Sequence, residues 1–337
     1  MSHDTGRTRS ARAEGRFSLG ERLSPRTSFL LRRLGRLAAS VCVVVLASFF
    51  LIHLVPGDPV RAALGPSASP ELVAATQASL GLDKPILQQF VDYLGGLLTG
   101  DLGTSIQSHR PVAQTIAERF PATLLLAVAA FAVAIAGALP IGLGMAISSR
   151  GGRRRGLDAA LSSLLGVLIA IPGFLLAVGF IALFSVQLGL LPAAGWGTIR
   201  SGILPVLALA LGPMAYLARI VQVEMITVLG TTYMTTARAK RLPSRLVYFR
   251  HALPNIVTAT LTVGGLILSG LTAATVLVET VFAIPGLGTT MVAAVSTKDY
   301  PMVQGVVLVY ALIVLGVNLV VDLILITIDP RSSITEG

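Results

Sequence analysis

Six long apolar runs without Asp, Glu, Lys or Arg limit what this chain can fold into. A helix needs about 20 mostly apolar residues to cross the hydrocarbon core of a bilayer. Helices buried in a soluble protein usually keep a polar face, so these runs predict six transmembrane helices. The third run is longer than one transmembrane helix needs, so we expect its helix to end near Gln187 and a loop to follow. The runs are Leu37–Val55, Pro121–Ser149, Ala159–Ile199, Ser201–Ala218, Ala252–Val278 and Tyr300–Val321.

The composition agrees with an all-α membrane protein. Hydrophobic residues make up 54% of the chain and charged residues 12%, whereas soluble domains carry about 25% charged residues. The net charge of +10 comes from short basic blocks beside apolar runs, which is typical of membrane topology, so we expect no nucleic-acid partner. The single Cys42 excludes a disulfide within the chain, and four scattered histidines predict no metal site.

The basic blocks also predict the orientation in the membrane. Residues 1–36 contain nine arginines and three acidic residues, and residues 150–155 and 238–250 are similarly basic. Residues 56–120 instead contain four basic and six acidic residues. Because Lys and Arg accumulate in cytoplasmic loops, the three basic blocks are predicted to be cytoplasmic. Six spans then place both termini in the cytoplasm.

These signals divide the chain into five parts. We expect the first apolar run to be retained, because it exceeds a typical signal-peptide core and no small-x-small cleavage pattern follows it. The predicted parts are a disordered basic cytoplasmic tail (1–30), a first transmembrane helix (31–55), an extracytoplasmic segment (56–120), a five-helix transmembrane core with a cytoplasmic loop at 226–252 (121–330), and a cytoplasmic C-terminal tail (331–337).

The sequence carries no motif for chemistry of its own. It contains no GxxxxGK[ST] phosphate loop, GxSxG or HExxH, so we expect no catalytic residue and a separate energy source. Ionisable residues in the middle of a span would instead indicate an ion-coupled secondary transporter acting alone, the alternative function. Glu279 closes the fifth run, and with Gln304 and Asn318 in the sixth it forms our set of candidate pathway or gating residues. Their positions near span ends or on helix faces favour the alternative that they are interface or helix-packing residues.

The segment between the fourth and fifth runs has the most informative pattern. Gly230 can end the preceding helix, and a short helix fits Thr232–Arg241 before Pro243 stops it. Ser244 can cap a second short helix. Leu242, Leu246, Phe249 and Leu253 recur at helical spacing, opposite a stripe of Arg238, Arg241 and Arg245. Such a hairpin suits either a groove of a partner protein or an anionic lipid surface, and the spacing favours neither.

This segment resembles the EAA loop of ABC peptide importer permeases, specifically the B-type subunit of the dipeptide/oligopeptide family. The family form is R-T-A-R-A-K-G, then nine residues and H-A-L. Thr235–Arg241 and His251–Leu253 match it with the same spacing. Arg241 stands where the family usually has Gly, which allows a positive-φ turn, so we expect a different turn geometry here.

Further motifs of the same family occur in order from about residue 30 to residue 332. Each is short, but their order and spacing are specific to the family. They are His53–Pro59, Leu80–Pro85, Gly100–Ser105, Glu118–Thr123, Glu279–Gly288, Asp299–Pro301 and Asp329–Arg331.

The resemblance implies the type I ABC importer permease fold in a bacterial inner membrane, with di- or oligopeptides or a related small solute as cargo. It implies a second, C-type permease subunit, two ATPase subunits that hold ATP and Mg, and an extracytoplasmic substrate-binding protein. It implies no cofactor on this chain. It also makes 226–252 the loop that couples to the ATPase, through Thr235, Thr236, Ala237, Arg238, Ala239, Lys240, Arg241, Leu242, Arg245, Leu246, Phe249, His251, Leu253 and Pro254.

Overall fold

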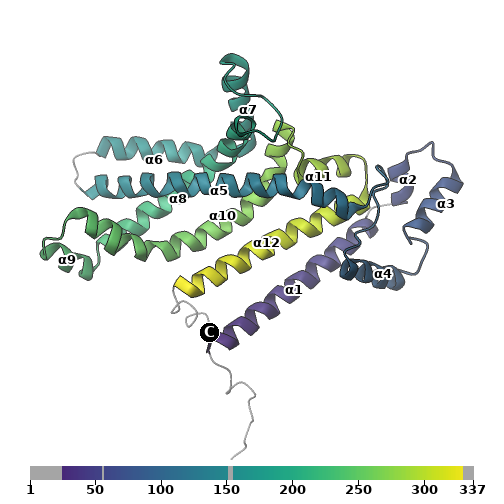
Figure 1. Ribbon diagram of the computed structural model, residues 1–337, viewed down its shortest axis with the longest axis horizontal. Coiled ribbons are helices and arrows are strands. Elements are labelled where there is room, and N and C mark those ends of the chain that lie inside the picture. The colour runs from purple at the N-terminus through teal and green to yellow at the C-terminus, as the bar shows by residue number, and fades with distance from the viewer. Residues whose placement is uncertain (1–24, 55–56, 151–154, 329–337) are drawn as a thin grey trace, which may run out of the picture.

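The computed structural model describes residues 25–54, 57–150 and 155–328. The predicted C-terminal tail and residues 1–24 of the predicted N-terminal tail lie outside these ranges, as does the Asp329–Arg331 motif. Every named element of the described residues is helical (Figure 1). The α-helices are α1 (Pro25–His53), α2 (Pro59–Leu64), α3 (Pro70–Ser79), α4 (Ile86–Thr99), α5 (Val112–Arg150), α6 (Arg155–Ala170), α7 (Gly173–Phe180), α8 (Ile199–Leu229), α9 (Thr232–Ala239), α10 (Leu253–Phe282), α11 (Leu287–Ser296) and α12 (Tyr300–Ile328). Two π-helical segments, η2 (Ile181–Gln187) and η3 (Leu246–Ala252), extend α7 and precede α10.

Five of these helices are long and apolar enough to cross a membrane: α1, α5, α8, α10 and α12. The third apolar run gives α6, α7 and η2, and it makes a sixth span when the bent pair is counted as one. The structure therefore agrees with the six spans predicted from the sequence. Several helices extend beyond their apolar runs. A charged residue ends an apolar run in the sequence, but it does not end a helix. Helix α5 begins at Val112, before the expected Pro121, and α8 continues past Arg219 to Leu229.

The third span is not the continuous helix that its apolar run indicated. It ends at Gln187 as expected, but its two halves meet at an angle of 98°. The break lies at Ile171–Pro172, where Pro172 has extended backbone angles and α7 starts after it. A proline disfavours helical geometry in the preceding residue and removes one backbone donor, which explains a break at this point.

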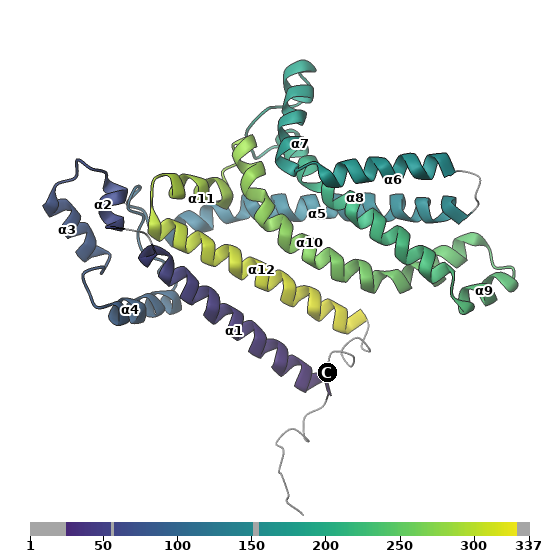
Figure 2. The same cartoon turned by 180° about the vertical axis from the view of Figure 1, so that it is seen from behind.

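Helices α5, α8 and α10 form the core of the bundle, and small residues set their spacing. Leu126, Ala130 and Ala134 of α5 pack with Ala208 of α8 and Phe282 of α10 in one buried cluster. Where neighbouring helices lack large side chains, their backbones can approach closely, as is common in membranes. Helix α12 packs on α10, and α1 packs on α12 at the edge of the bundle (Figure 2).

The two ends of the bundle carry different elements. Helix α9, the end of α5 and the start of α6 lie at one end, while α2, α3, α4 and α11 lie at the other (Figures 1 and 2). The start of α1 and the end of α12 also point away from α2–α4. The described parts of the basic blocks, at the start of α1, at the facing ends of α5 and α6 and around α9, therefore lie away from the segment predicted to be extracytoplasmic.

The contact between α5 and α8 gives a test of this packing. A Cβ atom on Gly142 would lie 2.4 Å from the Ala218 carbonyl oxygen and 2.7 Å from Val221 Cβ. We expect Gly142→Ala to destabilise the protein by about 1–3 kcal/mol, because the helices must move apart. Gly144→Ala is the matched control, since that position faces open space and alanine should raise helix stability by up to about 1 kcal/mol. Thermal unfolding in detergent measures both; equal melting temperatures would contradict the packing.

Candidate functional site

The predicted coupling segment forms a compact hairpin of α9, a turn and η3, residues 232–252. Helix α9 ends at Ala239, slightly before the expected Arg241. Met234 is completely buried, and it packs in one apolar cluster with side chains from three neighbouring elements. This cluster, which we name the Met234 cluster, consists of Ala146 of α5, Met225 and Leu229 of α8, Met234 of α9, and Val247 and Ala252 of η3. It fixes the hairpin to the ends of the long helices.

The π-helical geometry of η3 decides which side chains face outward. A π-helix bonds residues five apart, and Val247 and Ala252, which have this spacing, both face the Met234 cluster. Leu246 and Phe249 point outward, with 38% and 59% of their surfaces exposed. The apolar side chains do not form the single face expected from α-helical spacing, because Leu242 lies in the turn before η3 and packs against the Met234 cluster.

The outer surface of the hairpin has an apolar floor and a basic rim. Leu246, Phe249 and Pro254 line a shallow groove together with Arg245 and Arg250. Such a surface fits a partner that supplies a cleft with acidic groups at its edge. Of the other predicted coupling residues, Ala237 is only 9% exposed and His251 and Leu253 are half-buried. The exposed ones are Thr235, Thr236, Ala239, Lys240 and Arg241.

The turn between the two helices corrects one expectation. Arg241 has a φ of +55°, in the left-handed region. The arginine therefore adopts the conformation that glycine would favour, and the expectation of a different turn geometry is wrong. A non-glycine residue in this region costs roughly 1–2 kcal/mol, which the contacts of the hairpin must offset.

Glu279 lies at the opposite end of the molecule and is completely buried. The Thr123 hydroxyl donates to Oε1 over 2.6 Å, and the backbone N–H groups of Gly288 and Thr289 donate to Oε2 over 2.7 and 3.3 Å. Within the described residues its carboxylate forms no ion pair. It lies instead at the amino end of α11, where unpaired N–H groups and the helix dipole favour an anion.

The glycines after Glu279 make this arrangement sterically possible. A Cβ atom on Gly286 would lie 2.3 Å from Glu279 Oε2, and one on Gly288 would lie 2.8 Å from the same atom. The Glu279–Gly288 motif is therefore a structural unit in which a buried carboxylate caps the next helix.

The other two candidate pathway residues lie elsewhere. Asn318 Oδ1 accepts a hydrogen bond of 3.0 Å from Ser269 of α10, which joins α12 to α10. Gln304 accepts one of 3.0 Å at its backbone carbonyl from Ser48 of α1. The structure thus brings none of the three together, and their role in a pathway stays a prediction.

Sequence reasoning missed that several distant motifs meet at the α11 end. The buried Asp299 carboxylate accepts hydrogen bonds from the Ser105 hydroxyl and from the Ile106 backbone N–H, the latter over 3.1 Å. Two family motifs, far apart in sequence, are joined by this carboxylate. The sequence indicated only that both motifs belong to one family, and it did not indicate that they contact each other.

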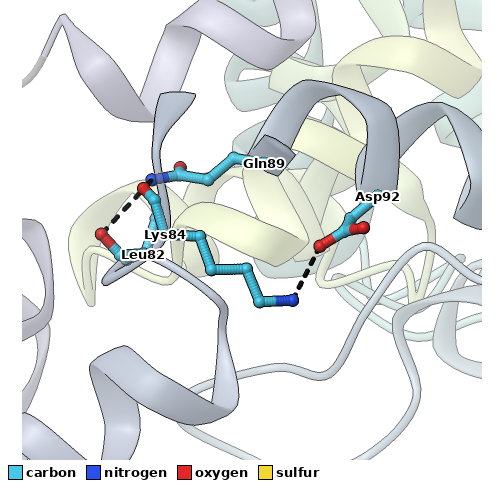
Figure 3. Close-up of polar contacts among 4 residues, drawn as sticks. All are labelled: Leu82, Lys84, Gln89 and Asp92. Atoms are coloured by element: carbon cyan, nitrogen blue, oxygen red, sulfur yellow. Dashed lines mark hydrogen bonds and ion pairs between the residues drawn. The ribbon is translucent and has the colours of Figure 1, made fainter. Parts of the chain in front are cut away.

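A second junction at this end holds the start of α4. The Gln89 amide donates to the backbone carbonyls of Leu82 and Lys84 over 3.2 and 2.8 Å (Figure 3). Its oxygen lies 3.0 Å from His53 Nε2, which links α4 to the end of α1. Lys84 also contacts Asp92 at 2.7 Å, and the hydrogen bond to that carboxylate raises the pKa of Lys84 (Figure 3).

Comparison with known proteins agrees with this architecture. Residues 138–334 match the family described as binding-protein-dependent transport system inner membrane component, and residues 26–127 match the N-terminal family of such membrane components. The chain therefore belongs to the permeases of ABC importers, with the type I fold, and is a multi-pass inner membrane protein. In this family ATP hydrolysis lies in separate subunits, and the permease works with partners. The family membership therefore does not support the alternative function, an ion-coupled secondary transporter acting alone.

Particular relatives cover nearly the whole chain. A Brucella abortus protein, provisionally named as a peptide transport system permease, is 38% identical over 313 residues, covering 90% of this chain and 98% of the relative. The glutathione transport system permease protein of Pectobacterium atrosepticum is 38% identical over 304 residues, with the same coverage. The dipeptide transport system permease protein of Lactococcus lactis is 36% identical over 306 residues, again with this coverage.

The contacts of Glu279 predict how substitutions there behave. Glu279→Gln keeps an oxygen for the Gly288 and Thr289 N–H groups and an amide for Thr123, so we expect most of the transport activity to survive. Glu279→Ala leaves buried donors unsatisfied, at about 1–3 kcal/mol each, and should reduce the melting temperature and the assembled protein. Uptake and thermal unfolding measure both variants. Loss of transport in a stable Glu279→Gln protein would contradict the capping role and indicate a proton-dependent one.

Proposed function

We propose that this chain is the subunit that provides a transmembrane path for di- or oligopeptides, or a closely related small solute, into the cytoplasm. The names of its relatives, which include peptide, dipeptide and glutathione permeases, support this cargo class. The observation that carries the mechanism is the hairpin, with an exposed groove outside and the buried Met234 cluster behind it. That arrangement suits a docking element that transmits movement.

The proposed assembly has the composition implied by the family resemblance. A C-type permease would pair with this chain, two ATPase subunits would bind ATP and Mg, and an extracytoplasmic binding protein would deliver the solute. The basic blocks favour a cytoplasmic position for the hairpin and both termini. Helices α2–α4 would then face outward, where the binding protein docks.

The proposed coupling follows from what the hairpin contacts. When ATP closes the two ATPase subunits, their clefts move, and the groove lined by Leu246 and Phe249 moves with them. Because Met234 and Val247 pack against Met225 and Ala146, the hairpin carries the ends of α8 and α5 with it. Helix α10 follows η3 directly in the chain. Movement of these helices would shift the bundle between two states that differ in access to the pathway.

The exposed position of Phe249 gives a direct test of docking. Phe249→Ala removes an outward side chain without touching the Met234 cluster, so we expect an unchanged melting temperature. We expect uptake to fall about tenfold or more, which corresponds to an interface side chain that contributes about 1.4 kcal/mol or more to binding. Val43→Ala is the matched control, since Val43 is 65% exposed on α1, outside both the hairpin and α2–α4. Uptake into proteoliposomes of the whole importer measures both. Normal uptake with Phe249→Ala would count against the docking role.

The orientation is tested separately by cysteine labelling. In a Cys42→Ser background, Glu71→Cys places a thiol on exposed α3 and Lys240→Cys places one beside α9. We expect an impermeant maleimide added to intact cells, with the outer membrane permeabilised if one is present, to label the first and not the second. The reverse pattern would overturn the proposed topology, and lysed cells, in which both should react, serve as the control.

A further inference from the structure

A crevice of about 140 Å³ lies between α1 and α12, near the helix ends closest to the two termini. Arg33, Arg36 and Ser40 of α1 line one wall, and Asn318 and Asp322 of α12 line the other. Helix α1 packs mainly against α12, at the edge of the bundle (Figures 1 and 2). The apolar side chains of Leu37, Leu315 and Leu319 complete the lining.

This crevice contains more hydrogen-bond donors than free acceptors. Its one acid, Asp322, already forms an ion pair with Arg33. Asn318 Oδ1 accepts from Ser269, which leaves the two amide hydrogens of Asn318 as donors. Within the described residues, neither Arg36 nor Ser40 has a hydrogen-bond or ion-pair partner on its side chain.

The depth of these donors suggests what satisfies them. Arg36 directly precedes the apolar run that begins at Leu37, so it lies where the hydrocarbon region begins. Ser40 is one helical turn further into that run, and Asn318 is one turn deeper than Asp322. Polar groups at such depth are costly unless they find acceptors. A ligand that fits has an anionic group at the boundary and ester oxygens about one turn below it.

We propose that this crevice binds the headgroup of an anionic phospholipid. The phosphate diester contacts the Arg36 guanidinium, the ester carbonyls accept from Ser40 and Asn318, and the acyl chains pack against Leu315 and Leu319 of the crevice wall. Basic pockets between transmembrane helices are suited to such headgroups. A free phosphate ion shares the charge, but it supplies neither the ester carbonyls nor the chains. The site lies outside the transport mechanism proposed above and does not rest on it.

The test uses the whole importer, purified in detergent and freed of lipid. Dioleoylphosphatidylglycerol, dioleoylphosphatidylcholine and inorganic phosphate are titrated separately, and bound lipid is counted by native mass spectrometry. We expect phosphatidylglycerol to bind more tightly than phosphatidylcholine, and Arg36→Gln to weaken its binding about fivefold. Arg219→Gln is the matched control, because Arg219 is an exposed arginine of α8 that does not line the crevice; it should leave that binding unchanged.

A second variant is expected to strengthen the binding of phosphatidylglycerol instead of weakening it. Asp322→Asn removes the carboxylate that repels a phosphate and releases Arg33, so phosphatidylglycerol should bind more tightly. If Arg36→Gln or Asp322→Asn fails to assemble, Ser40→Ala retains the fold and should weaken the same binding. Three outcomes would overturn the proposal: equal binding of both lipids, equal losses with Arg36→Gln and Arg219→Gln, or inorganic phosphate displacing the lipid at millimolar concentration.

Discussion

The burial of Met234 against the ends of α5 and α8 is the interaction on which this account depends. Without it, α9 would be a short helix of eight residues, too short to be stable by itself in water. The Met234 cluster gives the helix a fixed place and turns Leu246 and Phe249 outward. A hairpin fixed in this way can transmit force, whereas a loosely attached one would absorb it.

The other end of the molecule is fixed by buried polar contacts in addition to an apolar cluster of α5, α11 and α12. Two buried carboxylates, Glu279 and Asp299, are bonded to backbone N–H groups and hydroxyls from distant parts of the chain. Between the ends, closely packed helices such as α5 and α8 separate the two regions. The structure therefore has two well-defined ends joined by a small-residue interface, which is the kind of contact along which helices can slide.

The sequence predicted the spans and their family well, because hydropathy and motif order are local properties. It could not predict how charged residues within a helix are accommodated, so the ends of α5 and α8 differed from the apolar runs. A proline within an apolar run allows either a slight kink or a complete bend of the helix, so the sequence alone could not predict the sharp bend at Pro172. Leu242 lies in the turn before η3 and so left the expected apolar face, and Arg241 took a conformation that its residue type disfavours. Contacts such as Asp299–Ser105 join positions that no local pattern pairs.

The rigidity of the hairpin is tested most directly by an intramolecular distance. Spin labels introduced by Thr235→Cys on α9 and Val223→Cys on α8, in a Cys42→Ser background, report how these helices move relative to each other. The measurement is double electron–electron resonance on an importer that hydrolyses ATP, with and without a trapped nucleotide. The account predicts the same narrow distance distribution in both states, because the Met234 cluster moves as one unit. A nucleotide-dependent shift or broadening would show that α9 moves independently and would contradict it.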